Sequence, residues 1–173
     1  MGIIKPYHQG ELDSLCGIYS ILNSYRIVCN PDENKTQILF NDIVNYFSKK
    51  RLLKSILIDG MGFKEMNMVM KDVVYGYMPN YKLSWASFQN PTTRNFWNSM
   101  KNHLEDANSC VILGMTGRES HWSVGISATS KTMRLIDAEW KFLKYNLCST
   151  TVIDDKLYVL YPAQTYFISN KEF

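Results

Sequence analysis

Residues 8–25, HQGELDSLCGIYSILNSY, pass from a polar loop directly into an apolar segment. Apolar residues in this stretch recur at spacings of three and four, which predicts a helix with one buried face over residues 14–26. Asp13 or Ser14 is expected to cap this helix by accepting a hydrogen bond from its first free N–H groups. Cys16 falls in the first turn, at the boundary between the polar loop and the apolar face.

The rest of the chain divides into a helical part and a strand part. Helical spacing of apolar residues recurs over residues 36–49, 63–75 and 92–107. After residue 108, short apolar or alternating segments predict strands over residues 109–116, 121–129, 132–140, 156–162 and 165–169. Helices followed by strands indicate an α+β fold, in which a helical half packs on an antiparallel sheet. A length of 173 residues favours one domain, spanning residues 1–173.

Charge and hydropathy exclude several classes of partner. The net charge of +3 is small for this length, and the basic run KKRLLK at residues 49–54 is interpreted as a solvated helix end rather than a nucleic-acid surface. No run of apolar residues is long enough to span a membrane, and the N-terminus lacks the apolar core of a signal peptide. We therefore expect neither a nucleic-acid partner nor a membrane partner.

The four cysteines show no metal-binding pattern, because none forms a CxxC pair or lies near a histidine at zinc spacing. No metal or other cofactor is expected, and Cys29, Cys110 and Cys148 are predicted to be free thiols in the core. Cys16 differs because free N–H groups and the helix dipole favour a thiolate at a helix start. Gly17 costs helix stability, so we interpret it as room for a substrate backbone beside the sulfur.

A nucleophilic cysteine needs a base, and the base needs an orienting group. His121 begins the segment HWSVGISAT, and Asp137 lies in the following segment, so two antiparallel strands joined by a short turn would bring them together. The side-chain amide of Gln9, with the backbone N–H of Cys16, is a candidate donor to an oxyanion. His103 is expected to be solvated on the polar side of its helix.

These motifs resemble the papain-like cysteine peptidase superfamily, and most closely the bacterial leader-cleaving peptidases of bacteriocin exporters. The matching segments are QGELDSLCG, GRESHWSVGI and LIDAEW. The resemblance implies a papain-like fold with Gln9 as oxyanion donor, Cys16 as nucleophile, His121 as base and Asp137 as orienting carboxylate. Gln9 stands seven positions before Cys16, where six is usual, and Ala138 stands where the leader peptidases commonly have proline.

The resemblance implies a thiol-dependent hydrolase that cleaves peptide or isopeptide bonds in a protein or peptide substrate. The same machinery serves glutamine deamidases and transamidases, among them bacterial effector toxins, and a papain-like domain can also be a non-catalytic binding module. All three alternatives are open at this point. The expected location is the cytoplasm, or a target cell into which the protein is delivered as an effector. The sequence indicates neither the substrate nor the oligomeric state.

Overall fold

The computed structural model describes residues 6–8, 13–83, 92–117, 120–136, 142–151 and 156–170. Its α-helices are α1 (Cys16–Cys29), α2 (Glu33–Lys49), α3 (Leu53–Asp59), α4 (Phe63–Asp72) and α5 (Thr93–His103). Two short 3-10 helices are η1 (Val74–Gly76) and η3 (Tyr145–Leu147). The strands are β1 (Tyr81–Leu83), β2 (Ser109–Gly117), β3 (His121–Ala128), β4 (Thr132–Ile136), β5 (Phe142–Lys144), β6 (Cys148–Ser149) and β7 (Tyr158–Ser169).

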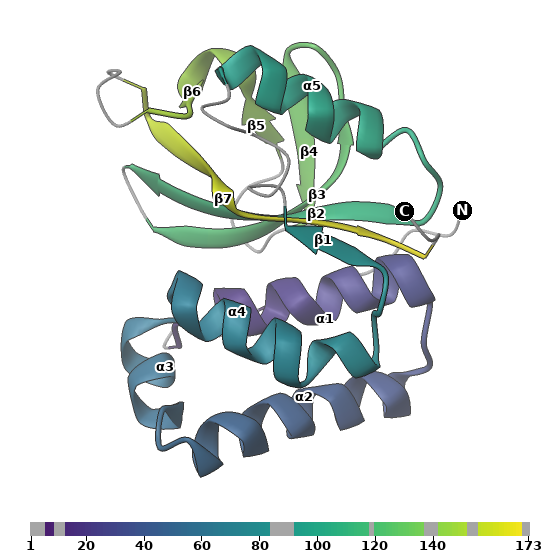
Figure 1. Ribbon diagram of the computed structural model, residues 1–173, viewed down its shortest axis with the longest axis vertical. Helices are drawn as coiled ribbons and strands as arrows, with labels where there is room; N and C mark the ends of the chain where they lie inside the picture. The colour runs from purple at the N-terminus through teal and green to yellow at the C-terminus, as the bar shows by residue number, and fades with distance from the viewer. Residues whose placement is uncertain are drawn as a thin grey trace.

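The strands form a mostly antiparallel sheet in the order β1-β7-β2-β3-β4-β5, and β6 pairs in parallel with β7. Figure 1 shows α1 to α4 gathered on one face of this sheet and α5 on the opposite face. The predicted α+β arrangement, with N-terminal helices packed on a C-terminal sheet, is confirmed. None of the described helices is long and apolar enough to cross a membrane.

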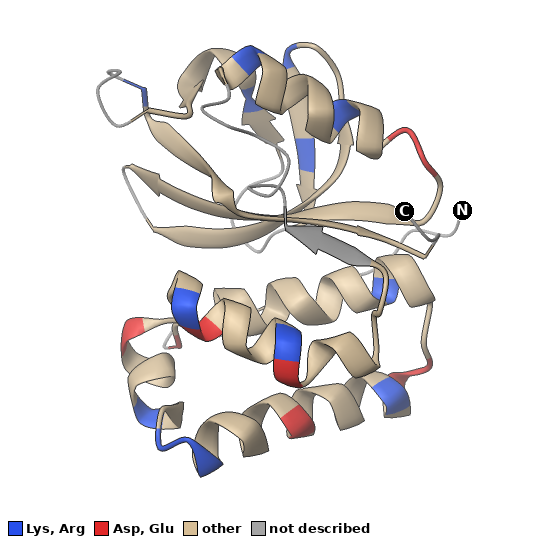
Figure 2. Ribbon diagram, in the orientation of Figure 1, with Lys and Arg blue, Asp and Glu red and all other residues tan. Residues whose placement is uncertain are grey.

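The sheet separates two hydrophobic cores because successive side chains of a strand point to opposite faces. In β2, Cys110 and Ile112 pack in the core that contains α1 to α4, whereas Val111 and Leu113 pack in the core under α5. Strands covered on both faces contain few polar residues. Accordingly, β2, β3 and β7 contain no Lys, Arg, Asp or Glu, and the charged residues lie mainly on the helices (Figure 2).

Helix α1 is the helix predicted from the opening stretch, and its apolar face packs on β2 and β3. Its N-cap residue is Leu15, so neither Asp13 nor Ser14 occupies the N-cap position itself. Asp13 accepts instead from the N–H of Leu15, at 3.1 Å. Ser14 is held elsewhere, because its Oγ donates to the carbonyl oxygen of Ile58 at 3.0 Å.

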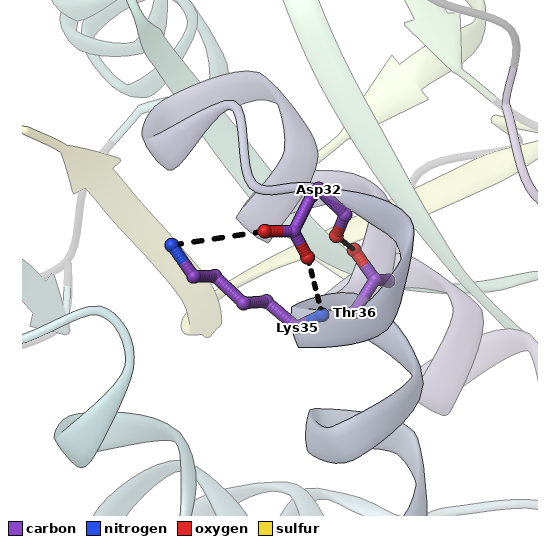
Figure 3. Close-up of polar contacts among 3 residues, drawn as sticks. All are labelled: Asp32, Lys35 and Thr36. Carbon is purple, nitrogen blue, oxygen red and sulfur yellow. Dashed lines mark hydrogen bonds and ion pairs between the residues drawn. The ribbon is translucent and has the colours of Figure 1, made fainter.

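Helix α2 begins three residues earlier than predicted, because Asp32 caps it (Figure 3). Asp32 Oδ1 accepts a hydrogen bond of 2.8 Å from the N–H of Lys35, and its Oδ2 lies 3.8 Å from Lys35 Nζ. Thr36 Oγ1 donates to the Asp32 carbonyl oxygen at 3.2 Å. The first turn of α2 is polar, so apolar spacing alone could not reveal it.

Three further differences concern short or irregular elements. Helix α3 and strands β1, β5 and β6 were not predicted, because each is too short to show a period. The two strands predicted over residues 156–162 and 165–169 are one strand, β7, with an irregularity inside it. Helix α5 is capped by Thr92 and ends at His103 rather than at residue 107.

Candidate functional site

A cavity of about 350 Å³ opens where the start of α1 meets the start of β3. Its walls come from the segment that leads into α1, the loop between α3 and α4, the facing ends of β2 and β3, and β7. The lining residues are Asp13, Ser14, Cys16, Asp59, Gly60, Met61, Gly62, Phe63, Gly114, Met115, Thr116, Ser120, His121, Trp122 and Gln164.

The candidate nucleophile lies at one wall of this cavity. Cys16 is the first residue of α1 and is half-buried, with its neighbour Leu15 in the core. Because the side chains of Ile18 and Ile21 are fully buried against the sheet, the first turn of α1 is held close to the strands. The position therefore combines a helix start with access to a cavity, which is the setting of reactive rather than structural cysteines.

The candidate base lies at another wall of the same cavity. His121 is the first residue of β3 and pairs with Met115 of β2, which also lines the cavity. The next residue, Trp122, is 5% exposed, and its Nε1–H donates a 2.6 Å hydrogen bond to the carbonyl oxygen of Met61. The start of β3 is thereby tied to the loop between α3 and α4.

The last turn of α3, which leads into that loop, is fixed to the segment before α1 as well. Ser14 donates from its N–H to the Leu57 carbonyl oxygen at 3.2 Å and from its Oγ to the Ile58 carbonyl oxygen at 3.0 Å. Gly60 closes α3 with a φ of +84°, a conformation that glycine adopts without strain. Hydrogen bonds therefore join the end of α3 and the loop after it both to the segment before Cys16 and to the start of β3.

The structure gives Gly17 a packing role that the sequence did not suggest. Gly17 is buried, and a Cβ at this position would lie 3.1 Å from Met61 Cε and 3.3 Å from Trp122 Cδ1. We therefore no longer interpret Gly17 as room for a substrate. The absence of a side chain at this position lets α1 pack closely against Trp122, the residue after His121.

The structure brings Cys16 and His121 to one cavity. The other two predicted site residues, Gln9 and Asp137, lie outside the described residues. On the N-terminal side, the backbone of Tyr7 is held against α1 by two hydrogen bonds with the Asn23 side chain, of 2.8 and 3.0 Å. Strand β4 ends at Ile136, the residue before Asp137.

The other described thiols do not line the cavity. Cys110 and Cys148 are buried as predicted, and burial raises the pKa of each thiol to about 12. The prediction for Cys29 is wrong, because the last residue of α1 is exposed. Loss of hydration nevertheless raises the pKa of the Cys29 thiol, whose Sγ lies 3.7 Å from the Tyr77 carbonyl oxygen.

His103 is not the solvated residue that its helix face suggested. It is half-buried, and its Nε2 lies 3.1 Å from the carbonyl oxygen of Cys110 and 3.0 Å from that of Ile168. Its ring also stands edge-on to the ring of Phe167. These contacts join α5 to β2 and β7. His103 therefore stabilises the packing of α5 and does not line the cavity.

Sequence reasoning missed Asp59, Gly114 and Gln164 as lining residues. Gly114 interrupts a buried strand, and an isolated glycine in a strand is a known sign of a bulge or a close approach. Nothing in the local pattern around Asp59 or Gln164 indicates a site, because each reaches the cavity only through the tertiary fold.

Within the described ranges, no group of three or more His, Cys, Asp or Glu side chains could hold a metal ion. Comparisons of the chain with protein-family models, with curated proteins and with solved structures find no match.

Proposed function

We propose that this chain is a thiol-dependent hydrolase with a papain-like arrangement, which cleaves peptide or isopeptide bonds in a protein or peptide substrate. Cys16 is the nucleophile, His121 the base, Asp137 the carboxylate that orients the base, and Gln9 a donor to the oxyanion. The observation that carries the proposal is that Cys16, at a helix start, and His121, at a strand start, line one cavity.

The chemistry follows from these roles. His121 takes the proton of the Cys16 thiol, and the sulfur attacks the substrate carbonyl carbon. The carbonyl π electrons move to oxygen, where the Gln9 amide and the backbone N–H of Cys16 stabilise the negative charge. Collapse of this intermediate breaks the C–N bond, the amine leaves with the proton from His121, and water then hydrolyses the thioester.

Two features support Cys16 over the other described thiols. Cys110 and Cys148 are buried with strongly raised pKa values, so neither forms a thiolate near neutral pH. Cys29 is exposed, but it ends its helix, where the dipole disfavours negative charge. Cys16 alone among these four combines a helix start with the cavity that contains a histidine.

The test is incubation with a peptide library followed by mass spectrometry. Wild-type protein should cleave a subset of peptides, Cys16→Ala should cleave none, and Cys29→Ala should match wild type. Loss of a triad residue costs on the order of 10⁴ in rate, and Gln9→Ala should cost about 10². Peptides that gain the mass of deamidation without cleavage would instead favour the deamidase alternative, and activity retained in Cys16→Ala contradicts both.

The proposed location is the cytoplasm, or a target cell that receives the protein as an effector. The proposal involves neither a nucleic acid nor a membrane, and the reaction needs no metal or cofactor, because the thiolate and imidazole supply the nucleophile and the proton transfer.

A further inference from the structure

We propose that the side-chain amide of Gln164 binds the peptide backbone of the substrate beside Cys16, so that the ligand of this cavity is a peptide held through its main chain. The inference rests on the proposed function, which it extends with a substrate-positioning residue on β7.

A bulge in β7 places Gln164 at the cavity. Leu113 of β2 pairs with Thr165, and Met115 pairs with Leu160, so residues 161–164 of β7 lie opposite Gly114. Extra residues in one strand form a bulge, and bulges commonly re-aim a side chain next to a functional site. The Thr165 Oγ1 donates to the Tyr161 carbonyl oxygen at 3.0 Å, which closes the bulge on itself.

Gly114 makes room for the Gln164 side chain. A Cβ at position 114 would lie 2.8 Å from the Gln164 Cβ and 2.9 Å from its Oε1, so a side chain there would force Gln164 to move. The side chain of Gln164 therefore lies across the backbone of β2 at Gly114, one residue before Met115, the partner of His121. The glycine and the bulge together position one polar side chain in the cavity.

The amide of Gln164 has hydrogen-bonding capacity to offer a ligand. The residue is half-buried and lines the cavity with Cys16 and His121, and no bond of its side chain to another described residue is found. A glutamine amide presents two N–H donors and one carbonyl acceptor. A peptide backbone presents the complementary pair, one N–H and one C=O per residue, and polar groups removed from water are normally paired.

The test compares two alkylating reagents that reach the same sulfur. One is benzyloxycarbonyl-Ala-Ala chloromethyl ketone, which carries peptide amides, and the other is iodoethanol, which carries none. The rate of Cys16 alkylation is followed by peptide mapping, and for the peptide reagent the binding constant KI is separated from the alkylation rate constant. Gln164→Ala is compared with wild type and with Gln37→Ala, a matched change of an exposed glutamine on α2.

For Gln164→Ala we expect the KI of the peptide reagent to rise about tenfold, because one hydrogen bond to the reagent is lost. The alkylation rate constant should not change. The iodoethanol rate should stay within about twofold of wild type, and Gln37→Ala should match wild type with both reagents.

An unchanged KI in Gln164→Ala overturns the inference and leaves the proposed function standing. An equal loss with both reagents also overturns it, because Gln164 then supports the fold or the thiol rather than the ligand. A wild-type protein whose Cys16 reacts no faster than Cys29 with either reagent contradicts the proposed function itself, and the inference with it.

Discussion

The indole Nε1–H of Trp122 donates a 2.6 Å hydrogen bond to the backbone carbonyl oxygen of Met61. This bond joins the start of β3, where His121 lies, to the loop between α3 and α4, and both line the cavity. Because Gly17 packs against both partners, the same contact also sets the distance between α1 and β3. Trp122 therefore helps to hold the two walls of the cavity that carry Cys16 and His121.

Trp122→Phe tests this dependence. The variant keeps an aromatic ring and leaves the buried Met61 carbonyl without its donor, which should lower the free energy of unfolding by about 1–3 kcal/mol. Urea denaturation measures that change, and iodoacetamide labelling measures the rate at Cys16, which should fall.

Trp97→Phe is the control, because Trp97 on α5 also donates from its Nε1 to a backbone carbonyl, that of Thr129 at 2.8 Å, on the opposite face of the sheet (Figure 1). Because the Thr129 carbonyl belongs to an exposed residue, this variant should lose less stability, and the labelling rate of Cys16 should not change. If the two variants slow Cys16 labelling equally, the Trp122 bond has no particular link to the site.

Gly17→Ala tests the packing of α1 on β3. Helix propensity alone predicts a gain of about 1 kcal/mol from this substitution. The new Cβ would lie 3.1 Å from Met61 Cε and 3.3 Å from Trp122 Cδ1, and overpacking of this kind typically costs about 1–3 kcal/mol. We expect a net loss of stability in urea denaturation.

Gly76→Ala is the control, because a Cβ at position 76 would meet no atom within 4 Å. It should be neutral or slightly stabilising. A Gly17→Ala variant more stable than wild type would show that α1 has space at the tryptophan and would contradict the packing account.

Alkaline pH should destabilise the protein through its buried thiols and its hydrogen-bonded tyrosines. Burial raises the pKa of Cys110 and Cys148 from 9.0 to about 12. The pKa of Tyr77 rises from 10.0 to about 12, chiefly through its hydrogen bond to Asp42, and that of Tyr46 rises equally, chiefly through burial.

All four groups are protonated in both states below about pH 8, where their full contribution to stability is present. As the pH rises toward 12, the unfolded chain loses these protons first, so the free energy of unfolding falls. Urea denaturation between pH 8 and pH 11 in reductant should show this decline, and Cys110→Ala/Cys148→Ala should make it shallower. An identical slope in the double variant would contradict the assignment of the decline to the thiols.

His121→Ala and Asp137→Asn should differ in their effect on peptide cleavage. Loss of His121 removes the base, whereas Asp137→Asn removes orientation and charge but leaves the imidazole in place, so His121→Ala should cost more. Both are compared by kcat/KM on one cleaved peptide from the library. A larger loss in Asp137→Asn than in His121→Ala would contradict these roles.

Much of the fold is predictable because it rests on periodic segments. The faces of α1 and α4 and the alternation of β3 appear in the sequence, and they are the parts that the core buries. The first turn of α2 and the seven residues of α3 are set by capping and by contacts, so hydrophobic spacing could not show them.

The residues at the cavity also fall into those that the sequence could predict and those that it could not. That Cys16 and His121 line one cavity could be predicted because each stands at the start of a periodic segment, where a polar loop becomes a buried face. Gln164 could not be predicted, because its place depends on the register between β2 and β7 and on the bulge opposite Gly114. The packing role of Gly17 was missed for the same reason, since its neighbours Met61 and Trp122 are distant in sequence.

The most direct test of the account is the rate of iodoacetamide labelling of each cysteine in the native protein at about pH 6, where an ordinary thiol is almost entirely protonated. Peptide mapping over time gives the rate for Cys16 and for Cys29, the exposed thiol outside the cavity. We predict that Cys16 reacts at least about tenfold faster than Cys29, and that His121→Ala removes this difference in rate. A Cys16 that reacts no faster than Cys29, or that keeps its rate in His121→Ala, would contradict the claim that the two residues form a catalytic pair.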